Sequence, residues 1–334
     1  MRWASTAVLL LALAGCGSSQ SRLPPGAIAL RTLPAQGLIA QEHGGIALRD
    51  LQGHSLAWLP RFSLYPTSAA AQASLEDEFL SARLYLPLLH GPRGWYRLDV
   101  PRHALLRVQG ARVALAGGAS VVAKPRQAFT VERGGQVVLR GSVPNFRVLS
   151  PRLVQAGTTL LDITTERRWT LPPGCLAAGF HGEVVIVACG VAHGAEAAAR
   201  LSLERLDSRG VGHPLAPALA QLIPEAASLS PNKQWIAVEG DNGCAASYVY
   251  IAPTRGDAVR ILYGKSLRDP FASNYSSLLG WSADGRLVTQ ITPPHCDEPY
   301  GPQHPPNGVY LVDPRLLART FVTHTADAMW NSRG

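Results

Sequence analysis

The sequence predicts an all-β fold in which short strands form a ring of small sheets, and three observations support this prediction. First, residues 230–244 and 282–296 repeat one pattern of turn, strand and loop at a constant offset of 52. Second, each repeat continues into further short strands, so that one unit holds four strands, as propeller blades do. Third, hairpin turns recur along the whole chain. We therefore expect one β-propeller of four-stranded blades.

The two repeats match element by element. Each begins with a polar turn, Pro231-Asn232-Lys233 or Ala283-Asp284-Gly285, and continues into an apolar-rich strand and a loop that ends in cysteine. The later strands of the two units are expected at residues 248–251, 259–263, 309–312 and 320–323.

The turn followed by an apolar strand resembles the TolB-like and WD-repeat propeller families. Residues 229–233 (LSPNK) and 281–286 (WSADGR) carry the likeness, which extends over roughly a third of the chain. The resemblance implies the propeller fold. It implies no function, because one fold hosts many activities.

Seven candidate outer hairpins set the expected number of blades. Their turns are expected at residues 50–53, 99–102, 133–135, 162–166, 207–210, 253–256 and 313–315. Seven blades would take about 44 residues each, near the 40–45 typical of WD-type blades, whereas six would need about 51 and are the second choice. We expect an early strand at 27–31 to join the last blade and close the ring, and a short helix at 68–82 within a loop.

The amino-terminal residues predict export and a lipid anchor. Arg2 precedes a seven-residue apolar stretch at 7–13, which is too short to span a bilayer. The following LAGC, which ends at Cys16, resembles the lipobox of bacterial lipoproteins. This resemblance implies a signal peptide at 1–15 and lipid on Cys16, followed by a flexible tether to residue 27 and a propeller domain at 28–334. An ordinary signal peptide with an incidental cysteine is the alternative.

These features predict an extracytoplasmic protein that is held to the cell membrane or the outer membrane. The net charge is +8, but the arginines are spread along the chain without a dense run. A nucleic-acid partner is therefore not expected. The predicted partners are the membrane, through the anchor, and an envelope protein or extracellular ligand.

Four cysteines follow Cys16, and an even number in an oxidising compartment favours disulfides. Cys175 and Cys189 flank a predicted hairpin that turns at 181–182. Cys244 and Cys296 hold equivalent places in the two repeats. We predict the pairs Cys175–Cys189 and Cys244–Cys296. A metal site of four thiolates is the alternative, although no C-x₂-C pair is present.

The sequence indicates no catalytic residues. It has neither the G-x-S-x-G of serine hydrolases nor the H-E-x-x-H of zinc proteases. Several tryptophans occur in or beside predicted strands, and we expect them to fill the core between blades rather than to form a stacking platform. They are Trp58, Trp95, Trp169, Trp235 and Trp281.

The candidate ligand-binding residues lie in the longest loops, at 190–199, 240–247, 264–277 and 293–307, which should gather on one face of a propeller. Their polar side chains could bind a cation, an amine or a basic segment of a partner. They are Asp241, Asn242, His295, Asp297, Glu298, Tyr300 and His304. Ordinary solvation of surface loops explains the same composition.

The sequence thus predicts a membrane-anchored, extracytoplasmic binding module without a cofactor. The alternative is a metal-dependent hydrolase or lyase with its site on the loop-rich face, where carboxylates with His295 and His304 could hold Ca²⁺ or Zn²⁺.

Overall fold

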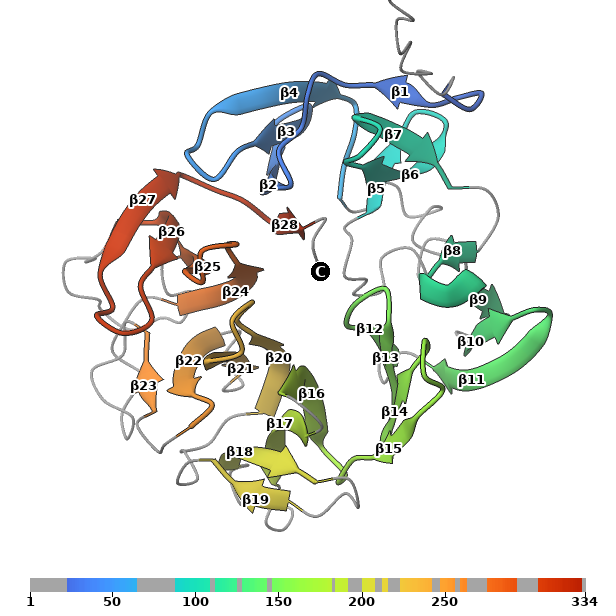
Figure 1. The fold of residues 1–334 in the computed structure, drawn as a ribbon. Helices are drawn as coiled ribbons and strands as arrows, with labels where there is room; N and C mark the ends of the chain where they lie inside the picture. The colour runs from blue at the N-terminus through green and yellow to red at the C-terminus, as the bar shows by residue number, and fades with distance from the viewer. Residues whose placement is uncertain are drawn as a thin grey trace, which may run out of the picture.

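The computed structural model describes most of the chain after residue 22. The described residues are 23–64, 88–108, 112–124, 128–142, 146–181, 184–191, 200–207, 212–215, 223–241, 247–255, 259–262, 275–292 and 306–331. Their strands form seven antiparallel sheets of four strands, arranged as a ring (Figure 1). The prediction of a seven-bladed propeller is confirmed, and the six-bladed alternative is wrong.

We number the blades in chain order. Blade 1 holds β2 (Gln36–Glu42), β3 (Gly45–Arg49), β4 (Ser55–Pro60) and the carboxy-terminal β28 (Ala328–Asn331). Blade 2 holds β5 (Leu88–Gly91), β6 (Gly94–Asp99), β7 (Ala104–Arg107) and the amino-terminal β1 (Ile28–Ala29). Blade 3 holds β8 (Arg112–Ala114), β9 (Ala119–Lys124), β10 (Ala128–Arg133) and β11 (Gln136–Ser142), with a short 3-10 helix at Ala116–Gly118.

Each of the other four blades is continuous in sequence. Blade 4 holds β12 (Phe146–Val148), β13 (Leu153–Ala156), β14 (Thr159–Asp162) and β15 (Arg168–Thr170). Blade 5 holds β16 (Cys175–His181), β17 (Val184–Val191), β18 (Arg200–Leu206) and β19 (Gly212–Pro214). Blade 6 holds β20 (Ile223–Leu229), β21 (Trp235–Asp241), β22 (Ser247–Pro253) and β23 (Arg260–Ile261). Blade 7 holds β24 (Tyr275–Trp281), β25 (Leu287–Thr292), β26 (Gly308–Val312) and β27 (Arg319–Thr323).

All seven predicted turns join consecutive strands; six join the two outer strands of a blade, and the turn at 99–102 joins the two middle strands of blade 2, where β1 lies outside β7. They join β3 to β4, β6 to β7, β10 to β11, β14 to β15, β18 to β19, β22 to β23 and β26 to β27. Two of the turns, at 207–210 and 253–256, extend beyond the described residues. The helix predicted at 68–82 lies outside them entirely. No helix in the described part of the chain is long and apolar enough to cross a bilayer.

The prediction that residues 27–31 close the ring is wrong. β1 pairs with β7 of blade 2, Ile28 opposite Leu105, and both Leu30 and Leu33 donate backbone hydrogen bonds to His103 of that blade. The ring is closed by β28, which pairs with β2 of blade 1 (Figure 1). Since β28 is the last strand of the chain, the two ends of the propeller sequence meet in one sheet.

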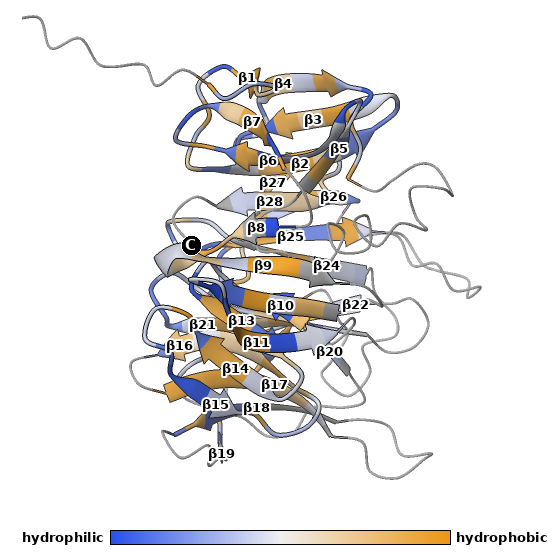
Figure 2. Ribbon diagram, turned by 90° about the vertical axis from the view of Figure 1, so that its right-hand side faces the viewer, coloured by the Kyte–Doolittle hydropathy of each residue, from blue (hydrophilic) through white to orange (hydrophobic). Residues whose placement is uncertain are grey.

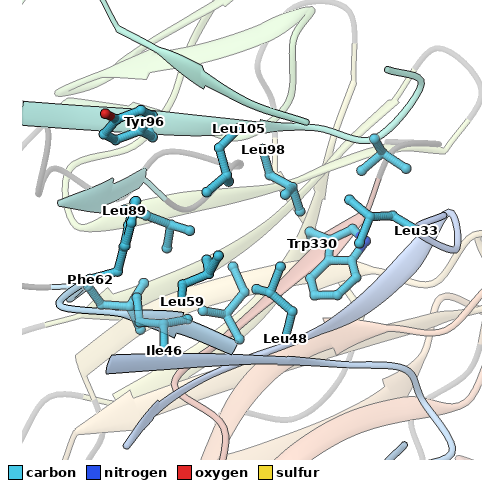
Figure 3. Close-up of a cluster of buried hydrophobic side chains, with 13 residues drawn as sticks. Leu33, Ile46, Leu48, Leu59, Phe62, Leu89, Tyr96, Leu98, Leu105 and Trp330 are labelled. Carbon is cyan, nitrogen blue, oxygen red and sulfur yellow. The ribbon is translucent and has the colours of Figure 1, made fainter. Parts of the chain in front are cut away.

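The core lies between neighbouring blades rather than in a single centre. Hydrophobic residues recur along the strands of the stacked blades (Figure 2), and clusters of buried residues lie between neighbouring blades. Between blades 1 and 2, Trp330 of β28 lies beside Leu33 and Leu48 (Figure 3). Trp330 is fully buried, and its indole donates to the Pro34 carbonyl at 3.2 Å. The closing strand is therefore anchored by packing as well as by its ladder.

Buried polar side chains also join blades. Gln155 of β13 donates to the Cys175 carbonyl at 2.8 Å and accepts from the Ala177 N–H at 3.0 Å, which joins blade 4 to blade 5. Gln36 of β2 joins blade 1 to blade 7 through the Trp281 carbonyl and the Ala283 N–H. Such paired contacts satisfy backbone groups that the ladder leaves free, and they fix the angle between blades.

Three of the five tryptophans behave as predicted, because Trp95, Trp169 and Trp281 are buried between blades. Trp235 is partly buried against the core between blades 6 and 7. Trp58 is the exception, since 46% of it is exposed on the outermost strand of blade 1. An outermost strand has no further neighbour to cover its side chains.

Candidate functional site

A cavity of about 860 Å³ lies among the inner strands of blades 4 to 7. Its walls come from β16, β20 and β24, with Met329 of the closing strand completing them. Most of the lining residues are apolar, and Leu149, Leu229 and Leu278 are examples. A volume of this size, with apolar walls and a few polar groups, is typical of a ligand site.

The cavity reaches the face of the ring that carries the short hairpin turns. Its lining includes residues of the β12–β13 turn, the β14–β15 turn and the β20–β21 turn. In a four-stranded antiparallel blade, turns between strands one and two and between strands three and four share one side, which we call the turn face. Loops between strands two and three, and the connections between blades, start from the opposite side, the loop face. The predicted ligand-binding loops belong to the loop face.

β-bulges shape the cavity walls. The inner strands of three consecutive blades each carry one, at Ala177/Gly179 in β16, Pro224/Ala226 in β20 and Leu278/Gly280 in β24. A bulge inserts one extra residue and re-aims the side chains that follow it. The residues directly after each bulge line the cavity. Many of them are glycine or alanine, which leaves space between the strands.

An ion pair between a buried carboxylate and a half-exposed arginine lies at one side of the cavity. Asp162 at the end of β14 is 2% exposed, and its carboxylate accepts hydrogen bonds from Arg152 Nε at 2.8 and 2.9 Å. The backbone N–H groups of Thr164 and Thr165 donate to it as well. Burial raises the pKa of Asp162, but these hydrogen bonds outweigh it and lower the pKa to about 2. The positive charge of Arg152 is therefore paired with the ionised carboxylate of Asp162.

Arg167 adds a second cation on the same side. Its guanidinium lies 4.7 Å from the ring centroid of Trp169, a cation–π contact, and Trp169 packs on Phe180 at 4.8 Å between centroids. Arg167 has no carboxylate partner among the described residues. The indole Nε1 of Trp169 is buried and likewise has no acceptor there.

Lys233 brings a third cation, from the turn of blade 6. The repeat places Lys233 at the position of Gly285, and the turns agree in detail: the N–H of each donates to a serine carbonyl at 2.9 Å, Ser230 or Ser282. Both residues have positive φ, 59° for Lys233 and 84° for Gly285. A left-handed backbone suits glycine and costs a residue with a Cβ about 1–2 kcal/mol. Lys233 is exposed and has no ion-pair partner in the described part of the chain.

Of the residues predicted to bind a ligand in the long loops, the structure describes only Asp241. Asp241 ends β21, with its backbone opposite Ile223 and Ser247. The remaining predicted site residues lie outside the described residues: Asn242, His295, Asp297, Glu298, Tyr300 and His304. The described residues hold no group of three His, Cys, Asp or Glu side chains that could bind a metal.

The disulfide predicted from the hairpin is present. Cys175 of β16 lies opposite Cys189 of β17 in the ladder, and the two are bonded. Cys244 and Cys296, like Cys16, lie outside the described residues, so the second disulfide and the lipidation site stay predictions.

Comparisons with known proteins do not assign a family. No protein-family model matches the sequence, and no curated protein does. Among solved structures, the chain is similar to TolB from Acinetobacter baumannii, with 10% identity over 89% of this chain and 65% of that one and a TM-score of 0.39. It is also similar to oligopeptidase B from Leishmania major (8% identity, 89% and 50% covered, TM-score 0.45) and to a prolyl endopeptidase (11%, 87% and 50%, TM-score 0.46). This chain spans less than two thirds of the length of each, and the propeller assignment rests on its own seven sheets.

The sequence did not single out the turn-face cavity. Its cations come from separate hairpins of blades 4 and 6, and no local pattern links them before the ring brings those blades together. One signal was available in the repeat: Lys233 stands where the equivalent turn has Gly285. A non-glycine residue at a position that favours glycine often marks a functional site.

Proposed function

We propose that the protein is a lipid-anchored, extracytoplasmic binding module for an envelope protein or an extracellular ligand. The observation that supports this proposal is the turn-face cavity, with its apolar walls and with Arg167 and Lys233 unpaired among the described residues. Apolar walls supply affinity, and a few charged groups at the mouth supply orientation and specificity.

The chemistry of the lining favours binding over catalysis at this cavity. Asp162 is its carboxylate, and a general base works best with a pKa near the working pH. With a pKa of about 2 and its oxygens taken by Arg152 and backbone N–H groups, Asp162 is a poor proton acceptor. The other polar groups of the described lining residues are hydroxyls, two indoles and cations, which bind and orient a ligand.

Site-specific photocrosslinking in intact cells tests the proposal. A photoreactive residue replaces Pro231, which is exposed and lines the cavity, or Arg140, an exposed residue of β11 that does not. We expect illumination to give a product from position 231, either a crosslink to a second protein or a mass shift from a small ligand, that is absent from position 140. Equal products from both positions, or none from either, would count against a binding role for the turn face.

A further inference from the structure

We infer that the turn-face cavity binds a small amphipathic carboxylate, with its apolar body among the inner strands and its acidic head toward Arg167 and Lys233. This inference rests on the proposed binding function and names the class of ligand. Three features of the cavity support it: the charge balance of the lining, the backbone at Lys233 and the apolar walls.

The charge balance of the described lining residues favours an anion. They include three cations and one carboxylate, and the carboxylate of Asp162 is already paired with Arg152. Arg167 and Lys233 are left without acidic partners in the described part of the chain. A guanidinium presents a planar fork that matches a carboxylate, and an ammonium adds a compact charge. The buried Trp169 Nε1, which has no acceptor among the described residues, is a further donor for a ligand oxygen.

The backbone at Lys233 is in a conformation that glycine would adopt without strain. The equivalent turn of blade 7 has glycine there, and glycine would remove the strain of a φ of 59°. Because strained residues cluster at functional sites, a lysine that lines the cavity in this conformation fits a role in ligand contact.

The apolar walls of the cavity indicate that the part of the ligand in contact with them is apolar. The lining includes side chains such as Leu229, Leu278 and Trp281, and the small residues that follow the bulges. The Trp281 indole N–H is already bonded to the Ser228 carbonyl at 3.3 Å. These walls therefore offer dispersion contacts and few polar partners, which suits a hydrocarbon chain or ring.

Calorimetric titration with four ligands tests the inference. The protein is the non-lipidated mature chain, residues 16–334 with Cys16→Ser, which keeps all the described strands because they lie within residues 28–331. Decanoate, decanol and decylammonium share one chain length and differ in charge, and hexanoate shortens the chain. We expect decanoate to bind at least about tenfold more tightly than decanol or decylammonium, because a charge-assisted contact contributes at least one decade. Each methylene lost toward hexanoate should weaken binding by up to about fourfold.

Two variants and a control give the residue-level test. Arg167→Ser and Lys233→Gly should each weaken decanoate binding by about tenfold and leave decanol binding unchanged. Lys233→Gly should melt at the same or a higher temperature, so that its loss of binding is not a loss of folding. Arg140→Ser, at an exposed arginine away from the cavity, should change neither quantity.

Several outcomes overturn the inference. Decylammonium that binds as well as decanoate would remove the role of the cations. Hexanoate that binds as well as decanoate would reduce the site to a surface anion contact, and unchanged binding in both variants would place the ligand elsewhere. If decanoate fails to bind while the residue at 231 still crosslinks, the ligand class is wrong and the binding function stands. If decanoate fails to bind and the residue at 231 gives no product, both the ligand class and the proposed binding function are contradicted.

Discussion

At the scale of single residues, Asp162 shows how this fold holds a buried charge. The carboxylate is almost inaccessible, yet Arg152 and two backbone N–H groups satisfy it. Its folded-state pKa of about 2 lies below the ordinary value of 3.8, so the ionised form is favoured by folding. The resulting stability is present above the unfolded-state pKa and is lost as the pH falls toward 2. The fixed Arg152 in turn holds the β12–β13 turn against β14 at the cavity mouth.

Asp162→Asn should therefore lower the free energy of unfolding at neutral pH by about 2 kcal/mol. The difference from the wild-type protein should shrink as the pH falls from about 5 to 2, since the wild-type carboxylate becomes protonated there. Chemical denaturation across that pH range measures it. Asp284→Asn is the matched control: burial raises the pKa of Asp284 and the Ser282 and Arg286 contacts lower it below normal, but its side chain is 56% exposed. An equal effect in both variants would contradict the explanation from burial.

At the scale of elements, β28 is the strand on which the ring depends. It supplies the fourth strand of blade 1, pairs with β2 over four residues and inserts Trp330 into the core between blades 1 and 2. Gly37, which faces Trp330 across the ladder, has no room for a side chain: an added Cβ would lie 2.2 Å from the indole. The closing strand and its partner are thus fitted to each other.

Trp330→Ala should cost about 3–5 kcal/mol, the range for truncating a buried aromatic residue. We expect the melting temperature to fall by roughly 5–15 °C, measured by calorimetry on the oxidised protein. Trp58→Ala removes the same side chain from an exposed site on β4 of the same blade and should have a much smaller effect. Comparable losses in both variants would mean that Trp330 is not a closing contact.

The elements also show what local patterns can and cannot predict. Blades 6 and 7 could be recognised because their turns repeat at one offset, and the outer hairpins because turn residues separate two short strands. The partner strand of β1 could not be predicted, because a strand of two residues does not indicate which sheet edge it joins. In the structure the segment is held to blade 2, where Leu30 donates a hydrogen bond to the His103 carbonyl. The bulges of β16, β20 and β24 were also missed, since a bulge depends on the pairing of two strands. The cavity follows from those bulges and therefore escaped prediction with them.

At the scale of the whole molecule, the ring separates the turn face from the loop face. The turn face holds the cavity with Arg167 and Lys233, whereas the acidic residues predicted for ligand binding belong to loops that start from the loop face, as Asp241 at the end of β21 does. Cations gathered at the turn face would attract an anionic partner toward that face.

The anchor itself is the last prediction. Residues 17–27 can span at most about 40 Å, so lipid on Cys16 would keep the propeller near the membrane surface. Cells fed an alkyne-tagged palmitate should label the wild-type protein, and the labelled protein should sediment with membranes after lysis. Cys16→Ser should lose the label, whereas Ser18→Ala, two residues away, should keep label and membrane association. A Cys16→Ser protein that is still processed to the same mature length would instead indicate an ordinary signal peptide, and the binding module would then act in solution outside the cytoplasm.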